Sequence, residues 1–365
     1  MTPLGLSVYD ARMPFRAPRA VVWLALLITS SAHAAVLRDH LYGVKALSET
    51  DAWAVGNYGA IYHTTNGGRT WEARDSGTKS PLFGIEFSDA QHGWAVGKSG
   101  EILATADGGK TWTRQKSPID TSKHLFKVRM ADAKTVWAVG DWGAIAVTTD
   151  GGATWEDRSL PKLVVHDGSR PDRQENLVLE DVVLYDVDWP DATHGYIAGE
   201  FATLLATSDG GATWEKRKLP TEKTIFGIDF ASADEGWAVG IDGLVMHTTD
   251  AGRSWTVQHG NPQPATIDEL AFNDALKNPG MYSVCVVGRT GIVVGDTGTI
   301  LISTDGGQSW TRHVLPDRER YSWLRAVSLV AGDRGVLVGA KGLSGSVQGS
   351  EVTLADGGKA VVPTE

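Results

Sequence analysis

The chain has 365 residues, of which 42% are hydrophobic and 21% charged, and its formal net charge at pH 7 is −10. This is an ordinary globular composition, and no run of Lys and Arg supplies the basic patch that a nucleic-acid-binding surface needs. We therefore expect a folded protein with a sizeable core and no nucleic-acid partner.

The first 34 residues have the pattern of an export signal. Arg12, Arg16 and Arg19 precede the apolar run AVVWLALLIT, and Ala32-His33-Ala34 then forms an A-x-A cleavage site. The run is shorter than a membrane span, and no cysteine adjoins the site, which argues against a lipid anchor. We expect 1–34 to be a cleaved signal peptide and 35–365 to be periplasmic or secreted; an uncleaved anchor is the alternative.

The rest of the chain repeats one unit of 41 to 59 residues. Each unit opens with a period-2 apolar run, such as LFGIEF, in which Phe83, Ile85 and Phe87 are expected to share one face. The seven such runs start near Leu41, Leu82, Leu125, Leu184, Ile225, Met281 and Trp323. A WAVG-like run follows each of them, at Trp53, Trp94, Trp137, Tyr196, Trp237, Ile292 and Val336. Strand periodicity at this repeat length predicts an all-β fold, a seven-bladed β-propeller of four-stranded blades.

Each unit closes with a turn of the form T-x-D-x-G-x-T-W. The turns are centred on Asn66, Asp107, Asp150, Asp209, Asp250 and Asp305, and they end at Trp71, Trp112, Trp155, Trp214, Trp255 and Trp310. The Asp is expected to accept hydrogen bonds from its own turn, and the Trp to fill a seam between blades with its N–H on a backbone acceptor. Each carboxylate stands alone, so we assign these residues a structural role and expect no metal.

The last unit is degenerate. A seventh turn, LADGGKAV around Asp356, has lost its Thr and Trp, and the final KAVVPTE resembles the outer strand of the last blade. Cys285, in the apolar run YSVCVV, is expected to be a packing residue rather than a nucleophile.

The unit GWAVGxxGxIxxTxDGGxTW resembles the photosystem II stability and assembly factor family of Asp-box, or bacterial neuraminidase, repeat proteins. The resemblance covers nearly all of the chain after residue 34. It implies a seven-bladed, exported propeller that acts as an assembly or scaffold protein without catalysis. Relatives in non-photosynthetic bacteria, often encoded beside transporters, mean that a photosystem is not implied.

One face of the propeller is expected to carry the binding loops. In a four-stranded blade, the turn between the second and third strands (the B–C turn) shares a face with the connection to the next blade (the D–A connection). Two D–A connections are long, at about 156–183 and 256–280, and a third enlargement at 340–352 is expected to lengthen a B–C turn. Long loops on a rigid scaffold often carry binding, although neutral loop growth is the alternative.

Candidate partner-binding residues lie on this face. Tyr58, Trp142 and Phe201 place aromatic side chains at turn positions where the repeat does not require them, which is typical of interface anchors. Shielding of a neighbouring blade is the simpler alternative. The other candidates are Lys98, Asp141, Glu200 and Asp242 in the turns, and His166, Arg170 and Arg173 in the loop VVHDGSRPDRQEN.

These patterns favour a binding module over an enzyme. The expected partner is a membrane or periplasmic protein, such as a transporter, bound through the loop-bearing face. A glycan-binding or sialidase-like glycoside hydrolase is the alternative, because Asp141, Glu200, Asp242 and Asp296 come from four blades and could converge at the axis. No B–C turn carries the arginine that sialic acid would need. No catalytic residue, metal or cofactor is indicated.

Overall fold

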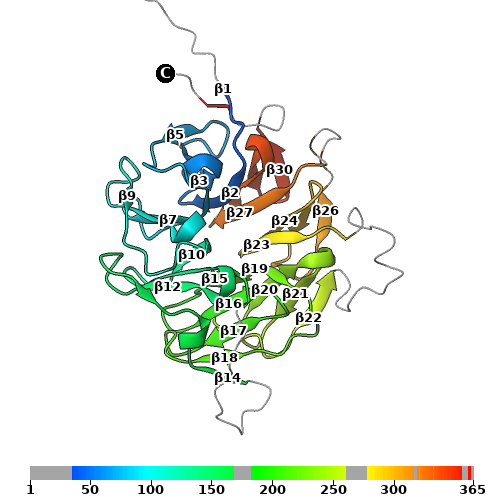
Figure 1. Cartoon of the computed structure of the whole chain (residues 1–365). Helices are drawn as coiled ribbons and strands as arrows, with labels where there is room; N and C mark the ends of the chain where they lie inside the picture. The colour runs from blue at the N-terminus through cyan, green and yellow to red at the C-terminus, as the bar shows by residue number, and fades with distance from the viewer. Residues whose placement is uncertain are drawn as a thin grey trace, which may run out of the picture.

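The computed structural model describes residues 35–167, 182–259, 278–313, 315, 319, 321–331, 333–355 and 361–362. They form a seven-bladed β-propeller in which each blade is an antiparallel sheet of four consecutive strands (Figure 1). The predicted signal peptide, 1–34, lies outside the described residues. Within the described part, no helix is long and apolar enough to cross a membrane.

The strands of each blade run outward from the central axis in chain order. Blades 1 and 2 contain β2 (Leu41–Ala46), β3 (Ala52–Gly56), β4 (Ile61–Thr64) and β5 (Glu72–Arg74), then β6 (Leu82–Phe87), β7 (Gly93–Gly97), β8 (Ile102–Thr105) and β9 (Thr113–Arg114). Blades 3 and 4 contain β10 (Leu125–Met130), β11 (Val136–Gly140), β12 (Ile145–Thr148) and β13 (Glu156–Asp157), then β15 (Leu184–Asp188), β16 (Gly195–Gly199), β17 (Leu204–Thr207) and β18 (Trp214–Lys216). Blade 5 contains β19 (Ile225–Phe230), β20 (Gly236–Gly240), β21 (Val245–Thr248) and β22 (Thr256–His259). Blades 6 and 7 contain β23 (Met281–Val287), β24 (Thr290–Gly295), β25 (Ile300–Ser303) and β26 (Thr311–His313), then β27 (Leu324–Val330), β28 (Arg334–Gly339), β29 (Ser344–Gln348) and β30 (Glu351–Leu354).

Every innermost strand carries a β-bulge at its second residue. In β6, Leu82 pairs with Gly97 and Gly84 with Val96, so Phe83 is the extra residue. A bulge shifts the alternation by one, and the core of this blade therefore contains Leu82, Ile85 and Phe87 while Phe83 faces the central channel. The prediction that Phe83 shares a face with Ile85 and Phe87 is wrong for this reason.

The Asp-box turns are built as predicted. Asp107 accepts a hydrogen bond from the Thr111 amide at 2.9 Å and one from the Thr111 hydroxyl at 2.7 Å. The Thr111 amide, with the hydroxyl, lowers the pKa of Asp107 to about 2. The same pattern of a turn amide bonded to the central side chain recurs at Asn66, Asp150, Asp209, Asp250 and Asp305.

The box tryptophans fill the seams between blades. The Trp214 ring lies 5.5 Å from the Trp137 ring of the preceding blade, and a side chain on box residue Gly109 would meet the Trp53 ring at 2.1 Å. Only one box indole N–H bonds to a backbone oxygen, from Trp255 to Gly252 at 3.0 Å. The indole nitrogens of Trp112, Trp155 and Trp214 are buried without a hydrogen-bond partner. The seam is therefore apolar packing more than hydrogen bonding.

The three predicted enlargements have different outcomes. In the first, the turn η4 (Leu160–Lys162) leads to β14 (Val165–Asp167), which adds a fifth, parallel strand to the outer edge of blade 4; 168–181 lie outside the described residues. In the second, β22 is followed by 260–277, which are also outside them. The expected long B–C turn at 340–352 is wrong. The chain makes a short turn, η6 (Ala340–Gly342), and then β29 pairs with β30 as an ordinary hairpin.

The C-terminal prediction is also wrong. The outer strand of blade 7 is β30, whereas β31 (Val361–Val362) pairs with β1 (Ala35–Val36) in a separate two-stranded sheet that brings the two ends of the propeller together (Figure 1). The seventh box, around Asp356, lies outside the described residues. Between blades 7 and 1, the Gly342 amide bonds to the Asp39 carbonyl at 2.7 Å and the Ala46 amide to the Ser328 hydroxyl at 3.0 Å.

Candidate functional site at the central channel

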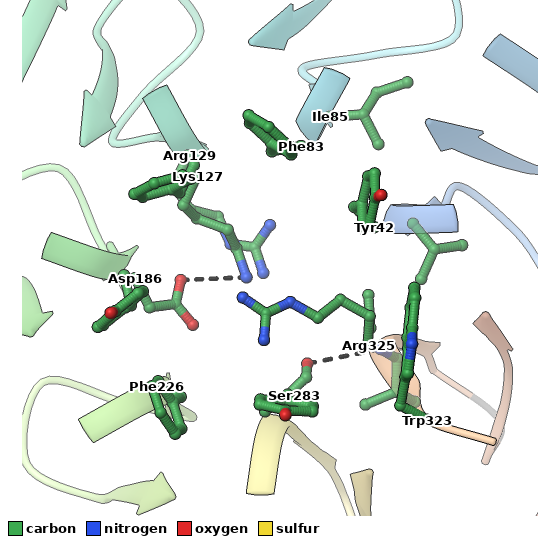
Figure 2. A pocket seen from close by; sticks show the side chains of 18 residues that line it. Tyr42, Phe83, Ile85, Lys127, Arg129, Asp186, Phe226, Ser283, Trp323 and Arg325 are labelled. Carbon is green, nitrogen blue, oxygen red and sulfur yellow. Dashed lines mark hydrogen bonds and ion pairs between the residues drawn. The ribbon is translucent and has the colours of Figure 1, made fainter. Parts of the chain in front are cut away.

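The innermost strands surround a cavity of about 350 Å³ on the propeller axis (Figure 2). It is lined mainly by the second, third and fourth residues of these strands, with Trp323 and Arg129 in addition, and the second residues lie beside the B–C turns. In blade 1, for example, Leu41 pairs with Gly56, the residue directly before the turn η1 (Asn57–Gly59). The mouth of the cavity is therefore on the face that the sequence analysis singled out.

The seven bulged residues form a layer near this mouth, which we call the aromatic layer. Six blades place an aromatic ring there and the seventh places a guanidinium; the members are Tyr42, Phe83, Phe126, Tyr185, Phe226, Tyr282 and Arg325. Neighbouring rings have centroids 5.0–6.0 Å apart from Tyr42 round to Tyr282. Arg325 lies 4.4 Å over the Tyr282 ring, and Trp323 stacks on Tyr42 at 5.8 Å. Edge and stacked contacts of this kind hold the rings in place.

A charged layer lies deeper, at the fifth residue of each inner strand. Its members are Lys45, Glu86, Arg129, Asp188, Asp229, Cys285 and Ser328. The Glu86 carboxylate forms ion pairs with Lys45 Nζ at 2.5 Å and with Arg129 NH1 at 3.1 Å. Arg129 Nε also lies 3.8 Å from the Asp188 carboxylate. Asp188 and Asp229 each accept a backbone amide of the next blade, at 2.8 and 2.7 Å. Only Arg129 of this layer lines the cavity, so the other members lie beneath it, and we call the layer the cavity floor.

Two partly buried carboxyls in the floor, Asp188 and Asp229, repel each other. Burial raises the pKa of Asp229 to about 8, with Asp188 as the next cause, and burial also raises the pKa of Asp188. Burial likewise raises the pKa of the Cys285 thiol to about 12, which fits a packing residue and disfavours a nucleophilic thiolate.

Replacing Asp229 with Asn is expected to flatten the dependence of stability on pH. The folded Asp229 keeps its proton above the ordinary pKa of 3.8, so its contribution to stability is complete at low pH and declines as pH rises through about 8. Asn retains the acceptor for the Val286 amide without the charge. Melting temperatures of wild type and Asp229→Asn, measured from pH 4 to 9, should diverge in favour of the variant as pH rises. Parallel curves would contradict this assignment.

The B–C turns bring the predicted aromatics to the surface on the face where the mouth opens, and none of the three lines the cavity itself. Tyr58, Trp142 and Phe201, which we call the turn aromatics, are 76%, 51% and 69% exposed. Each sits in left-handed backbone, with φ of 56°, 46° and 52°. The following residue, Gly59 in the first turn, also has positive φ, which makes a type I′ turn closed by the Ala60 amide on the Asn57 carbonyl at 3.0 Å. Bulky side chains are disfavoured at such positions, and the exposed rings gain no burial in compensation.

Substituting Trp142 with Asn should therefore stabilise the fold. Asn tolerates left-handed backbone, and the relief should be about 1 kcal/mol or somewhat less, because left-handed backbone costs roughly 1–2 kcal/mol for an ordinary residue. Chemical denaturation of both proteins measures the difference. A loss of stability would mean that the exposed ring contributes to folding after all.

The charged turn candidates have partners within the chain. Asp141 and Glu200 each accept a backbone amide at 3.1 Å, from His124 and Val183, at the start of their own blades. Asp242 pairs with Lys223 at 2.9 Å, and Asp296 accepts the Tyr282 hydroxyl at 2.7 Å. These four carboxylates support turn and strand geometry, which weakens their candidacy as a catalytic pair.

The remaining candidates separate from this group. Lys98 is exposed in the turn η2 (Lys98–Gly100), beside the mouth. His166 lies in β14, on the outer edge of blade 4 (Figure 1), where it pairs in register with Glu215 and is far out from the channel in its own blade. Arg170 and Arg173 lie outside the described residues. In the described ranges, no cluster of three or more His, Cys, Asp or Glu could hold a metal ion.

Seven blades, six of which carry an Asp-box turn, define this protein as a β-propeller of the Asp-box class. A family model described as photosynthesis system II assembly factor YCF48 matches residues 75–164 and 166–273, and a BNR/Asp-box repeat model matches 301–312. Since the first model covers more than half of the chain, the protein belongs to the YCF48 assembly-factor family. A comparison with curated proteins gives no match.

Solved structures share the fold at low sequence identity. A structure of YCF48 bound to a D1 peptide superposes with a TM-score of 0.64 at 18% identity, covering 87% of this chain and 96% of its own. YCF48 from Cyanidioschyzon merolae gives 0.63 at 19%, covering 86% and 96%. A GH74 xyloglucanase from Xanthomonas campestris gives 0.62 at 15% identity, covering 86% of this chain and 52% of its own. At these identities the likeness concerns the fold alone.

Proposed function

We propose that this protein is a non-catalytic, extracytoplasmic assembly factor that binds a segment of a membrane or periplasmic protein at the mouth of its central channel. The observation that carries the proposal is the set of turn aromatics on the face where that mouth opens. Three bulky rings stand exposed in left-handed turn positions, where small or amide residues are preferred. Strain that contributes nothing to folding is typical of a functional surface.

Family membership supports the same function. The family model is named for an assembly factor, and one structurally similar YCF48 is bound to a peptide, the D1 peptide. The export-type N-terminus supports an extracytoplasmic location, where membrane proteins expose their soluble segments. A transporter is the partner we favour, and the channel mouth is the part of the molecule that would receive its segment.

The test compares two triple variants of the full chain in affinity capture from detergent-solubilised membranes of the native host. The first changes Tyr58, Trp142 and Phe201 to Asn, which suits left-handed turns. The matched control changes Arg69, Lys110 and Arg253 to Asn in box turns on the opposite face. A partner recovered by wild type and control and lost by the first variant supports the proposal. Equal recovery by all three proteins would mean that the partner binds to another surface. Recovery of no partner by any of them would contradict the proposed assembly function.

The location is tested separately. Fractionation of host cells should recover the mature protein, beginning at Ala35, in the periplasm or medium. Recovery in the cytoplasm with an intact N-terminus would contradict the extracytoplasmic assignment.

A glycoside hydrolase remains the second candidate, with weaker support. The GH74 structure resembles this chain in fold only, and the four turn carboxylates already bond within the chain. Hydrolysis of a xyloglucan or sialoside by purified protein, lost on Asp141→Asn, would favour this candidate over the first.

A further inference from the structure

Arg325 interrupts the aromatic layer with a positive charge. Its inner strand, β27, has the same bulge as the other six, and its side chain reaches from that bulge into the middle of the cavity (Figure 2). The guanidinium lies over the Tyr282 ring, and within the described part of the chain it has neither an ion pair nor a hydrogen bond. The side chain is partly withdrawn from solvent, and this burial lowers the pKa of Arg325 from its ordinary value. An arginine held in such a place usually has an anion beside it.

The other charges that line the cavity are already paired. Lys127 Nζ lies 3.0 Å from Asp186, and Arg129 NH1 lies 3.1 Å from Glu86. Asp186, the only carboxylate among the described residues of the cavity lining, also accepts the Ile228 amide at 3.1 Å. Among the described charged residues of the lining, Arg325 is therefore the one without an ion pair, although the Asp186 and Asp296 carboxylates act on it from further away. The overall net charge of the chain is −10. The cavity favours an anion although the protein as a whole repels one.

The shape of the cavity restricts the rest of the ligand. Rings surround the guanidinium, with Tyr42, Phe83 and Trp323 on one side and Phe226 on the other (Figure 2). The charged layer crosses the channel beneath the cavity through its ion pairs, so we expect a ligand to approach from the mouth and to present one end to Arg325. A volume of about 350 Å³ is near the lower end of small-ligand sites, which begin at about 300 Å³.

We propose that the channel binds a single carboxylate carried on an apolar body, with Arg325 engaging the carboxylate oxygens and the aromatic layer enclosing the apolar part. A guanidinium matches a carboxylate through two parallel N–H donors, and a neighbouring ring keeps its plane fixed. Two sources share this chemistry: the last residue of a polypeptide and a free organic acid. The inference rests on the proposed function in one respect, since a partner's chain end would enter at the mouth, on the face that carries the turn aromatics.

The test uses the purified full chain and defined probes in titration calorimetry. The probes are a short peptide ending in Leu-Phe with a free carboxylate, the same peptide with an amide end, and 3-phenylpropionate with its amide. The variants are Arg325→Gln and Arg325→Lys, and the control is Arg334→Gln, an exposed arginine paired with Glu49 at 3.3 Å. Melting temperature of each variant checks the fold, and Arg325→Gln should melt no lower than wild type because an unmatched charge is removed.

We expect the free acids to bind, the amides to bind at least tenfold more weakly, and Arg325→Gln to lose the difference. Arg325→Lys should weaken binding as well, since an ammonium cannot engage both oxygens in one plane. Binding of the peptide acid alone identifies a chain end as the ligand, and binding of phenylpropionate alone identifies a small acid; both support the site. Equal binding of acids and amides, an Arg325→Gln variant that binds like wild type, or no binding by any probe would overturn the inference. The capture experiment is independent, because partner recovery can persist when all probes fail.

Discussion

Glu86→Ala is expected to destabilise the propeller by about 3–5 kcal/mol, the cost typical of breaking a buried ion pair from one side. The Glu86 carboxylate is 1% exposed and joins Lys45 of blade 1 to Arg129 of blade 3. Its own burial would raise the pKa of Glu86, but Lys45 and Arg129 reverse this and hold it below the ordinary value. Removing the carboxylate leaves two cations facing each other across the channel floor.

Denaturant unfolding of wild type and Glu86→Ala at pH 7 measures the loss. Because the folded pKa is depressed, the stabilisation from Glu86 is present above the unfolded value of 4.5 and disappears as pH falls through the folded value. The difference between the two proteins should therefore shrink in acid. The control is Lys79→Ala, which changes an exposed residue in the loop before blade 2. This substitution should change the free energy of unfolding by less than about 0.5 kcal/mol. A difference that is small at pH 7 would show that the floor is readily hydrated.

Trp214→Ala is expected to cost about 3–5 kcal/mol, because deleting a large buried ring leaves a cavity that the rigid seam cannot close. Trp214 is 1% exposed and lies edge-on to both Trp137 and Trp189, at 5.5 and 5.9 Å. Its N–H has no partner, so the whole loss comes from packing.

The matched control is Trp142→Ala, the same substitution at an exposed turn. Its stability should stay within about 1 kcal/mol of wild type, since surface changes are usually small and left-handed strain persists with Ala. Chemical denaturation of both variants separates the two classes of tryptophan. Similar losses would mean that the turn aromatics are part of the folding core.

The blade count, the box turns and the exposure of the turn aromatics were predictable from the sequence. They depend on short-range rules: strand alternation, turn residues with fixed spacing, and a repeat that is read seven times. The bulge at Phe83 was not predictable in the same way, because the apolar pattern of the run LFGIEF is compatible with a regular strand and with a bulged one. Only the pairing partner decides which register the strand adopts.

The aromatic layer left a signal that a comparison of the repeats with one another would have found. Six of the seven inner strands have an aromatic second residue, and the seventh has Arg325. Within any single strand the second residue looks like one more apolar position. The aromatic layer becomes visible only when the second residues of all seven inner strands are compared. The charged layer is visible in the same way at the fifth residue, but which charges pair depends on the geometry of the closed ring.

Blade 7 was predicted incorrectly because its markers were lost. Without the box Thr and Trp, the segment from Gly342 to Leu354 offered no turn signal, and its serines and glycines suggested a loop. The structure places a tight turn at Gly349-Ser350, between β29 and β30, where Gly349 has a φ of 57°. Sequence reasoning therefore failed where the repeat itself had drifted.

Polar contacts connect each inner strand to the next and form a closed ring around the channel. Glu86, Arg129, Asp188, Asp229, Ser283 and Ser328 each bond to the neighbouring blade, and together they complete the circuit from blade 7 back to blade 1. Every blade is one contiguous piece of chain, and β1 and β31 lie side by side. The ring thus has no structural first member, and a circular permutant joined between β31 and β1 and opened between two other blades would keep every blade intact. A ring of contiguous blades of this kind is the product expected from head-to-tail duplication of a gene for one blade, and it does not depend on which copy comes first in the chain.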